Sequence, residues 1–144
     1  MDSSDIISII ALIVSIIAAA YEIYLNRKIN TINLNAYYFN EIYREHLINK
    51  IPKARKYISI SNNKVVGCIY MIKEMQELQS DSLYYKYSDR VYFEKLKKSA
   101  QILEEYLIDC DNKTFVGEEQ TDFLNNLATY LEKLYKVINE KYIK

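Results

Sequence analysis

The stretch that decides the fold is residues 6–25, IISIIALIVSIIAAAYEIYL, which is uncharged except for Glu22. As a helix rising 1.5 Å per residue, it would extend about 30 Å, the thickness of the hydrocarbon of a bilayer. Tyr21 and Tyr24 lie near its polar end, and such amphipathic rings prefer the membrane interface. The stretch therefore predicts a single N-terminal transmembrane helix.

The charges that flank this stretch predict its orientation. Asp2 and Asp5 precede it, and Arg27 and Lys28 follow it. Because basic residues favour the cytoplasmic side, we expect a single-pass protein of the bacterial inner (cytoplasmic) membrane with its N-terminus outside. Two alternatives stay open. Residues 18–20 resemble a signal-peptide cleavage site, although an acidic start is unusual for one, and the uncharged run is also short enough for a buried core helix.

Small and polar side chains recur within the predicted span at heptad spacing, while the rest of it is mostly Ile, Leu and Val. The stripe consists of Ser8, Ala11, Ser15, Ala18 and Glu22. Small residues let transmembrane helices approach closely, and serine hydroxyls can bond across the contact. We therefore expect a homo-oligomer seam, in which a ring of Glu22 carboxylates would line a pore. In the alternative, Glu22 reaches the interface and the helix is only an anchor.

Basic residues are concentrated in the part of the chain that follows the span. The membrane-proximal set is Arg27, Lys28, Lys53, Arg55 and Lys56. Each such charge near an anionic lipid surface contributes about 1 kcal/mol of attraction, so membrane lipids are expected partners. Tyrosines interleave with basic residues along the chain, which leaves RNA contact by stacking open. Alternatively, these charges only solvate helices and satisfy the topology rule.

We divide the chain into an anchor and oligomerisation helix, residues 1–28, and a cytoplasmic α-helical domain, residues 29–144. With two glycines and one proline in the chain, we expect few, long helices. Residues 33–50 have helical spacing up to an expected interruption at Pro52, and residues 65–79 form a second helical pattern. The apolar positions of the first pattern are Leu34, Tyr38, Ile42, Leu47 and Ile48.

The clearest amphipathic patterns are those of the last two predicted helices. After residues 80–87, which form a break or a loop packed by Tyr84 and Tyr85, Ser88 and Asp89 form an N-cap signal. The seam that follows comprises Phe93, Leu96, Ala100, Leu103, Leu107 and Cys110. The seam of the last helix, residues 118–142, comprises Leu124, Leu127, Leu131, Leu134 and Ile138. Together these patterns predict an all-α protein with a helical bundle.

The sequence offers no constellation for catalysis. His46 is the only histidine, which excludes a metal site with two histidines, and we interpret it as a satisfied or solvent-facing side chain. Gly67 and Gly117 stand alone, so no glycine-rich phosphate loop is present. Cys68 and Cys110 belong to no metal or redox motif and are expected to be reduced thiols in or near the core. We expect no enzymatic activity, cofactor or metal.

Three segments resemble those of a known group of proteins. NAYYFNEIYREHLINKIPKARKYI (35–58), SLYYKY (82–87) and LEEYLID (103–109) are similar to the small membrane accessory proteins encoded beside the RNA-guided, RNA-cutting effector of type VI-B CRISPR systems. The resemblance implies a divergent HEPN-like helical domain, ring oligomers with a membrane pore, and antiviral defence by loss of membrane integrity. It also implies an RNA-guided effector nuclease, encoded nearby, as a partner.

The chain departs from this pattern at the nuclease motif. HEPN ribonucleases use an Arg followed by a His at a longer spacing than the one that separates Arg44 from His46, and no His follows Arg55 or Arg90. RNA cleavage is therefore not expected. The sequence predicts a homo-oligomeric membrane pore or channel that acts in antiviral defence and perturbs the inner membrane. The alternative is a membrane-tethered helical module that binds a protein or RNA partner without forming a pore.

Overall fold

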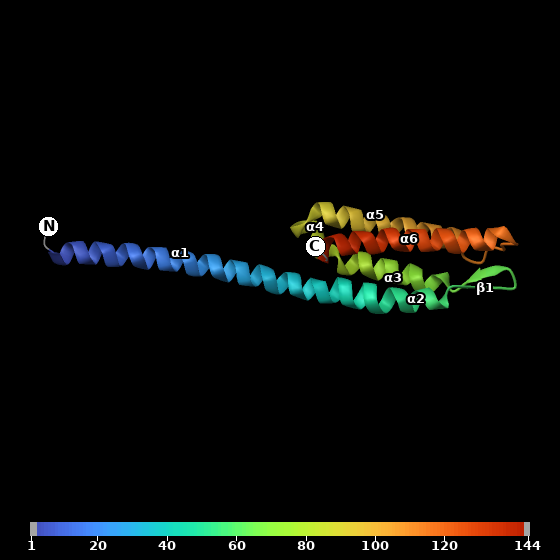
Figure 1. The fold of residues 1–144 in the computed structure, drawn as a ribbon, viewed down its shortest axis with the longest axis horizontal. Coiled ribbons are helices and arrows are strands. Elements are labelled where there is room, and N and C mark those ends of the chain that lie inside the picture. Colours follow the sequence, from blue (N-terminus) through green and yellow to red (C-terminus); the bar gives the residue numbers. More distant parts are fainter. Residues whose placement is uncertain (1–2, 143–144) are drawn as a thin grey trace. The chain divides into compact units, whose positions relative to one another are not determined.

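The structure is a computed structural model that describes residues 3–142, with side chains described for residues 12–141. It divides the chain into two compact units, Met1–Tyr37 and Tyr38–Lys144. The elements in chain order (Figure 1) are α1 (Ser3–Tyr38), the π-helix η1 (Phe39–Lys50), α2 (Ile51–Tyr57), β1 (Ser59–Ser61), β2 (Lys64–Val66), α3 (Cys68–Asp81), α4 (Leu83–Ser88), α5 (Arg90–Cys110) and α6 (Glu118–Tyr142). The chain is predominantly helical, which confirms the predicted all-α character.

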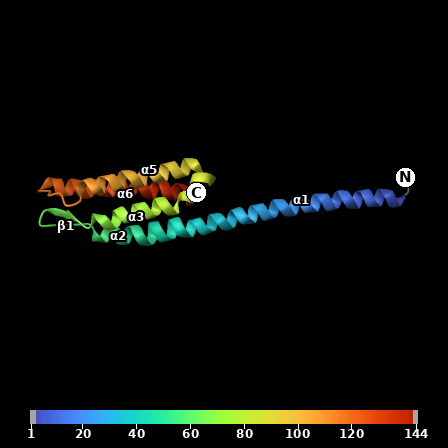
Figure 2. The same cartoon turned by 180° about the vertical axis from the view of Figure 1, so that it is seen from behind.

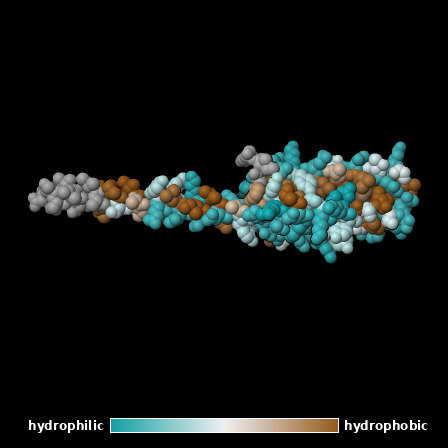
Figure 3. Space-filling view, turned by 60° about the horizontal axis from the view of Figure 1, so that its bottom comes forward, coloured by the Kyte–Doolittle hydropathy of each residue, from teal (hydrophilic) through white to brown (hydrophobic). Residues whose placement is uncertain are grey.

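The first unit consists of most of α1, and every side chain described in it, from residue 12 to residue 37, is exposed. Leu12, Ile16 and Ile17 each expose about three fifths of their surface. Figure 3 shows hydrophobic surface on α1 next to the grey end, with hydrophilic and hydrophobic patches mixed further along the helix. The predicted span starts at residue 6, and the side chains of residues 6–11 lie outside those described. No helix within the described residues is both long enough and apolar enough to cross a membrane.

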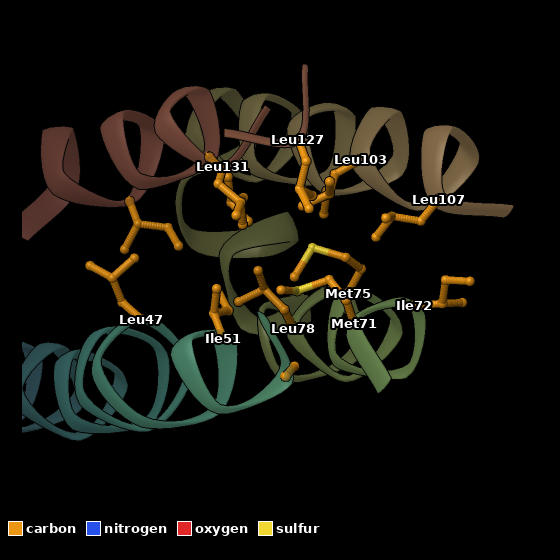
Figure 4. Packing of buried hydrophobic residues seen from close by; sticks show 14 of the residues in the cluster. Leu47, Ile51, Met71, Ile72, Met75, Leu78, Leu103, Leu107, Leu127 and Leu131 are labelled. Atoms are coloured by element: carbon orange, nitrogen blue, oxygen red, sulfur yellow. The ribbon is translucent and has the colours of Figure 1, made fainter. Parts of the chain in front are cut away.

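The second unit is a helical bundle in which α3, α5 and α6 enclose most of the core. Figures 1 and 2 show α5 beside α6, and α3 beside α2. Figure 4 shows how the side chains of these helices interdigitate: Leu103 and Leu107 come from α5, Leu127 from α6, and Met71 and Met75 from α3. All five are fully buried. Because each helix presents an apolar stripe to its neighbours, the bundle removes most of this area from water.

The predicted seams of α5 and α6 largely coincide with the buried faces. All of the predicted α5 positions are buried. In α6, Leu127, Leu131, Leu134 and Ile138 are buried as predicted, but Leu124 is 39 % exposed. Phe123, one residue earlier and only 2 % exposed, takes its place because its ring packs against Tyr106 and Phe115.

A short hairpin replaces the start of the helix predicted for residues 65–79. β1 and β2 pair antiparallel with Ile60 opposite Val65, and Asn62 and Asn63 form the turn with positive φ angles. Val65 is buried in the strand, where its amide donates to Lys113 O at 3.0 Å. α3 therefore begins only at Cys68. The prediction that the helix includes Val65 is wrong, because a single apolar position at helical spacing fits a strand equally well.

The segment after α3 was expected to be a break but forms a helix, α4, which is stabilised by aromatic contacts. Tyr84 stacks on Tyr38 with a centroid distance of 4.1 Å, and Tyr85 is buried against the edge of Tyr92. The N-cap prediction is confirmed: Asp89 accepts a hydrogen bond from the amide of Tyr92 at 3.1 Å and starts α5.

η1 differs from the α-helix expected over residues 33–50. It is a π-helix of 12 residues, and α2 follows it directly with Pro52 in its first turn. Proline is tolerated there because the first amides of a helix have no intrahelical partner. Ile42 and Leu47 are buried as predicted, but Leu34 on α1 and Ile48 on η1 are about half exposed. The predicted spacing assumed 3.6 residues per turn, and the wider turns of η1 move Ile48 out of the core.

Candidate functional site

The described residues of the predicted oligomer seam lie exposed on α1. Ser15, Ala18 and Glu22 are separated by three and four residues, so they lie within about 60° of one another around the helix axis. Ser8 and Ala11 belong to the predicted seam, but their side chains are outside the described residues. The structure thus places the described part of the stripe on one face of a helix that exposes its apolar side chains.

The predicted membrane-proximal basic residues fall into two sets, one in each unit. Arg27 and Lys28 are exposed on α1, and Lys53 and Lys56 are exposed on α2. Arg55 is partly buried, and its guanidinium donates to the carbonyl of Ile58, the C-cap residue of α2, at 3.3 Å. This donor stabilises the end of α2. Arg55 therefore presents less charge to a surface than the other four.

His46 is the centre of a charged cluster that the sequence did not reveal. Its ring is fully buried, with Nδ1 2.5 Å from Glu74 Oε1 and Nε2 2.9 Å from Asp81 Oδ2. Both partners belong to α3, and Glu74 is itself buried. A neutral imidazole can donate from only one nitrogen, so two carboxylate acceptors favour the doubly protonated cation. The interpretation of His46 as a satisfied side chain is confirmed, but its ionic partners are new.

Opposing effects set the pKa of His46. Burial lowers the pKa, whereas the hydrogen bonds to Glu74 and Asp81 and the charge of Glu74 raise it, and the net result is a raised pKa. Lys50, four residues after His46 on η1, forms an ion pair with Glu77 at 3.1 Å. The cluster thus joins two basic residues of η1 to three carboxylates of α3.

One sequence signal could have found this cluster. His46 and Lys50 are four residues apart, and Glu74, Glu77 and Asp81 follow one another at spacings of three and four. Each set therefore lies on one side of a helix, with opposite charge. The signal is weak without the fold, because nothing in the sequence says that these two helices are neighbours.

A groove lies next to the cluster, between α2 and α3. Its volume is about 300 Å³, and its lining residues are Lys50, Lys53, Ala54, Tyr57, Tyr70 and Glu74. Tyr57 and Tyr70 stack on each other at 4.3 Å between ring centroids. The volume is at the lower end of the range for ligand pockets. The lining combines two ammonium groups, a buried carboxylate and two exposed aromatic rings.

A second cluster of charge and aromatic rings fixes the end of α6. The Lys141 ammonium lies 2.6 Å from Asp89 Oδ2 and within 5.5 Å of the ring centroids of both Tyr85 and Tyr92. The contact combines an ion pair with two cation–π interactions. It attaches the last turns of α6 to the start of α5.

The two cysteines are free and buried, as predicted. Burial, together with the nearby Asp111 and Cys110, raises the pKa of Cys68 to about 12, and burial also raises the pKa of Cys110. Both thiols therefore remain protonated at neutral pH and are poor nucleophiles. Within the part of the chain that the structure describes, no group of three or more His, Cys, Asp or Glu residues could hold a metal ion.

The chain matches no known protein family, no curated protein and no solved structure.

Proposed function

We propose that this chain is a single-pass membrane protein that self-associates through α1 and forms a pore or channel. The observation that supports this proposal is the exposure of α1. Leu12, Ile13, Val14, Ile16 and Ile17 each expose more than half of their surface, and consecutive residues point in different directions around a helix. A helix that exposes large apolar side chains in several directions requires cover from lipid or from other chains.

The stripe on α1 supports self-association in particular. Ser15 and Ala18 are small, and they lie on the same side of the helix as Glu22. In lipid, small residues permit close helix contacts, and a carboxylate is costly unless it faces water or a bundle interior. A ring of α1 helices with this face inward would place Glu22 carboxylates around a water-filled path. Such a ring favours cations.

The biological setting is an extension that rests on the sequence resemblance. Arg27 and Lys28 would hold the C-terminal side of the span in the cytoplasm, and the second unit would then be cytoplasmic. The resemblance to the accessory proteins of type VI-B CRISPR systems suggests an antiviral effector of the inner membrane that acts with an RNA-guided nuclease. Opening of the pore would depolarise the infected cell.

A leakage experiment on the purified chain tests the pore. The full chain in liposomes is expected to release a trapped dye, and the protein mass of the particle in mild detergent should be that of several 17.1 kDa chains. The double variant Ser15→Leu, Glu22→Leu should lose leakage, because it removes the polar lining. The matched control Ile16→Leu, Ile17→Leu should retain it. A monomer that releases no dye would contradict the proposal.

A tethered interaction module is the second candidate, and the division of the structure into two units favours it. Tyr38–Lys144 has its own buried core, so a domain could act while α1 only anchors it. Replacement of residues 1–25 by an unrelated single-pass anchor distinguishes the two functions. Retained antiviral protection would favour the module, and lost protection with the chain still in the membrane would favour the pore.

A further inference from the structure

The π winding of η1 places its buried side chains on one side of the helix. Ile42 and Ile51 are both fully buried, with His46 and Leu47 buried between them. In an α-helix the separation of nine residues between Ile42 and Ile51 makes about 2.5 turns, which would put the two side chains on opposite sides. In a π-helix, whose hydrogen bonds join residues five apart, the same residues make about two turns and share a side. The bond from the Ile51 amide to His46 O shows this spacing directly.

A π-helix of this length competes with the α-helix formed by the same residues. Fewer than about 1 % of residues in proteins are in π-helices, which occur mostly as single turns and frequently at functional sites. Conversion of Phe39–Lys50 to an α-helix would keep one backbone bond per residue. It would turn either Ile42 or Ile51 away from the core. Contacts specific to the π form must therefore decide between the two windings.

His46 makes the strongest such contacts, because it is in the middle of η1 and both of its nitrogens meet carboxylates of α3. We propose that His46, Glu74 and Asp81 form a proton-operated latch that holds η1 in its π winding. With the proton bound, both ring N–H groups donate to carboxylate oxygens. When the proton leaves, one ring nitrogen lone pair faces an oxygen lone pair at hydrogen-bonding distance. This repulsion opens the latch, and η1 rewinds towards the α form.

The groups around His46 determine the pH at which the latch opens. On α3, Glu74 and Asp81 contact the ring, and on η1, Lys50 opposes its charge but is paired with Glu77. From the other elements packed on η1, Lys53 of α2 is exposed, and the hydroxyl of Tyr135 of α6 donates to Leu47 O at 3.5 Å. Among the described residues, two carboxylates, those of Glu74 and Asp81, act on the ring against the one ammonium group of Lys50. The carboxylates therefore stabilise the proton on His46.

The direction of the pH effect follows from the raised pKa. The pKa of His46 exceeds its ordinary value of 6.5 in the folded chain. The latch therefore contributes its full stability below about pH 6.5 and loses it as the pH rises through the folded pKa. Each unit by which the folded pKa exceeds the unfolded one corresponds to about a tenfold change in the closed-to-open equilibrium.

Because His46 is the only histidine, its imidazole can be observed in the full chain without assignment. Histidine labelled with ¹⁵N and ¹³C in the detergent-solubilised chain should show two protonated ring nitrogens at pH 6 and one at high pH. Amide hydrogen exchange, corrected for its intrinsic pH dependence, should accelerate in Phe39–Lys50 and at Ile51 over the same titration. The amides of α5 should keep their protection.

Three variants separate the latch from general stability. His46→Gln should show, at every pH, the η1 exchange that the wild type shows at high pH. Asp81→Asn, at a partly exposed position, should move the opening to lower pH while the bundle stays folded. Asp122→Asn, at an exposed carboxylate of α6 outside the cluster, is the matched control and should leave the η1 profile unchanged.

Two results would overturn the proposal. One is a His46 ring with a single protonated nitrogen at pH 6. The other is η1 exchange that does not change while the ring loses its proton. If His46→Gln fails to fold, the wild-type titration and Asp81→Asn still decide the outcome. For the winding itself, through-hydrogen-bond couplings should join the Ile51 amide to His46 O at low pH and to Leu47 O at high pH. A coupling that stays on His46 O after deprotonation would refute the rewinding.

Discussion

α1 and α5 are both long helices rich in large apolar residues, but α5 buries these side chains and α1 exposes them. α5 fully buries Leu96, Leu103 and Leu107, with charged residues on its other side. α1 exposes Ile16 and Ile17 at 61 % and 63 %. Neighbours in the same bundle can cover an apolar stripe, whereas large apolar side chains exposed in several directions need lipid or other chains. Burial of apolar side chains therefore stabilises the second unit, whereas the apolar side chains of the first unit are exposed and available to lipid or to other chains.

Truncation of one buried and one exposed side chain is the strongest test of this contrast. Leu103→Ala should lower the free energy of unfolding of the second unit by about 2–5 kcal/mol, because it leaves a cavity in a packed core. Ile17→Ala should leave that free energy unchanged. Urea unfolding of the full chain in detergent, followed by tyrosine near-ultraviolet circular dichroism, measures both. A loss at Ile17 as large as that at Leu103 would break the comparison.

The sequence predicted the helices whose apolar residues repeat with a period of 3.6. All six predicted positions of the α5 seam are buried, because charged residues alternate regularly with them, but the seam omitted Tyr92, which is buried as well. Phe123 was missed in α6 because its burial depends on the rings of Tyr106 and Phe115, which come from other elements. The hairpin was missed because its strands have three residues each, too few to show alternation.

The candidate sites differ in the same way. The shared face of Ser15 and Glu22 follows from helix spacing alone, whereas their role as an oligomer seam stays a prediction. In the cluster, His46 contacts Glu74, which is 28 positions later in the chain, and Asp81, which is 35 positions later. The direction in which the His46 ring points depends on the π winding of η1. No local pattern specifies that winding, because it is selected by contacts with α3. Tertiary contacts were therefore the missing information.

The two glycines with positive φ angles give a second, smaller test inside the bundle. Gly67 has φ +83°, and a Cβ there would lie 2.0 Å from the backbone oxygen of Tyr57. Gly117 has φ +60° and open space around it. Gly117→Ala should cost about 1 kcal/mol for the strained backbone, and Gly67→Ala about 3 kcal/mol or more, because the clash with Tyr57 adds to it.

Thermal unfolding of the two glycine variants side by side checks this difference. The result also bears on the comparison with α1. The backbone of Gly67 lies close to Tyr57 because the elements of the second unit pack tightly, whereas the described side chains of residues 12–37 are exposed. Equal losses at Gly67 and Gly117 would mean that the turn into α3 can shift to admit a side chain. The packing at this end of the second unit would then be looser than the contact implies.

The smallest expected effect concerns Asp89, which caps α5 and binds Lys141 at 2.6 Å. Asp89→Ala should cost about 1 kcal/mol, mostly from the lost cap. Asp89→Asn keeps a capping oxygen and removes only the charge, so it should cost no more than about 0.5 kcal/mol, and the cost should shrink in high salt. Urea unfolding at low and high salt measures both variants. If Asn costs as much as Ala, the attachment of α6 through Lys141, rather than the cap, stabilises this end of the bundle, and the cation–π contacts with Tyr85 and Tyr92 depend on that ion pair.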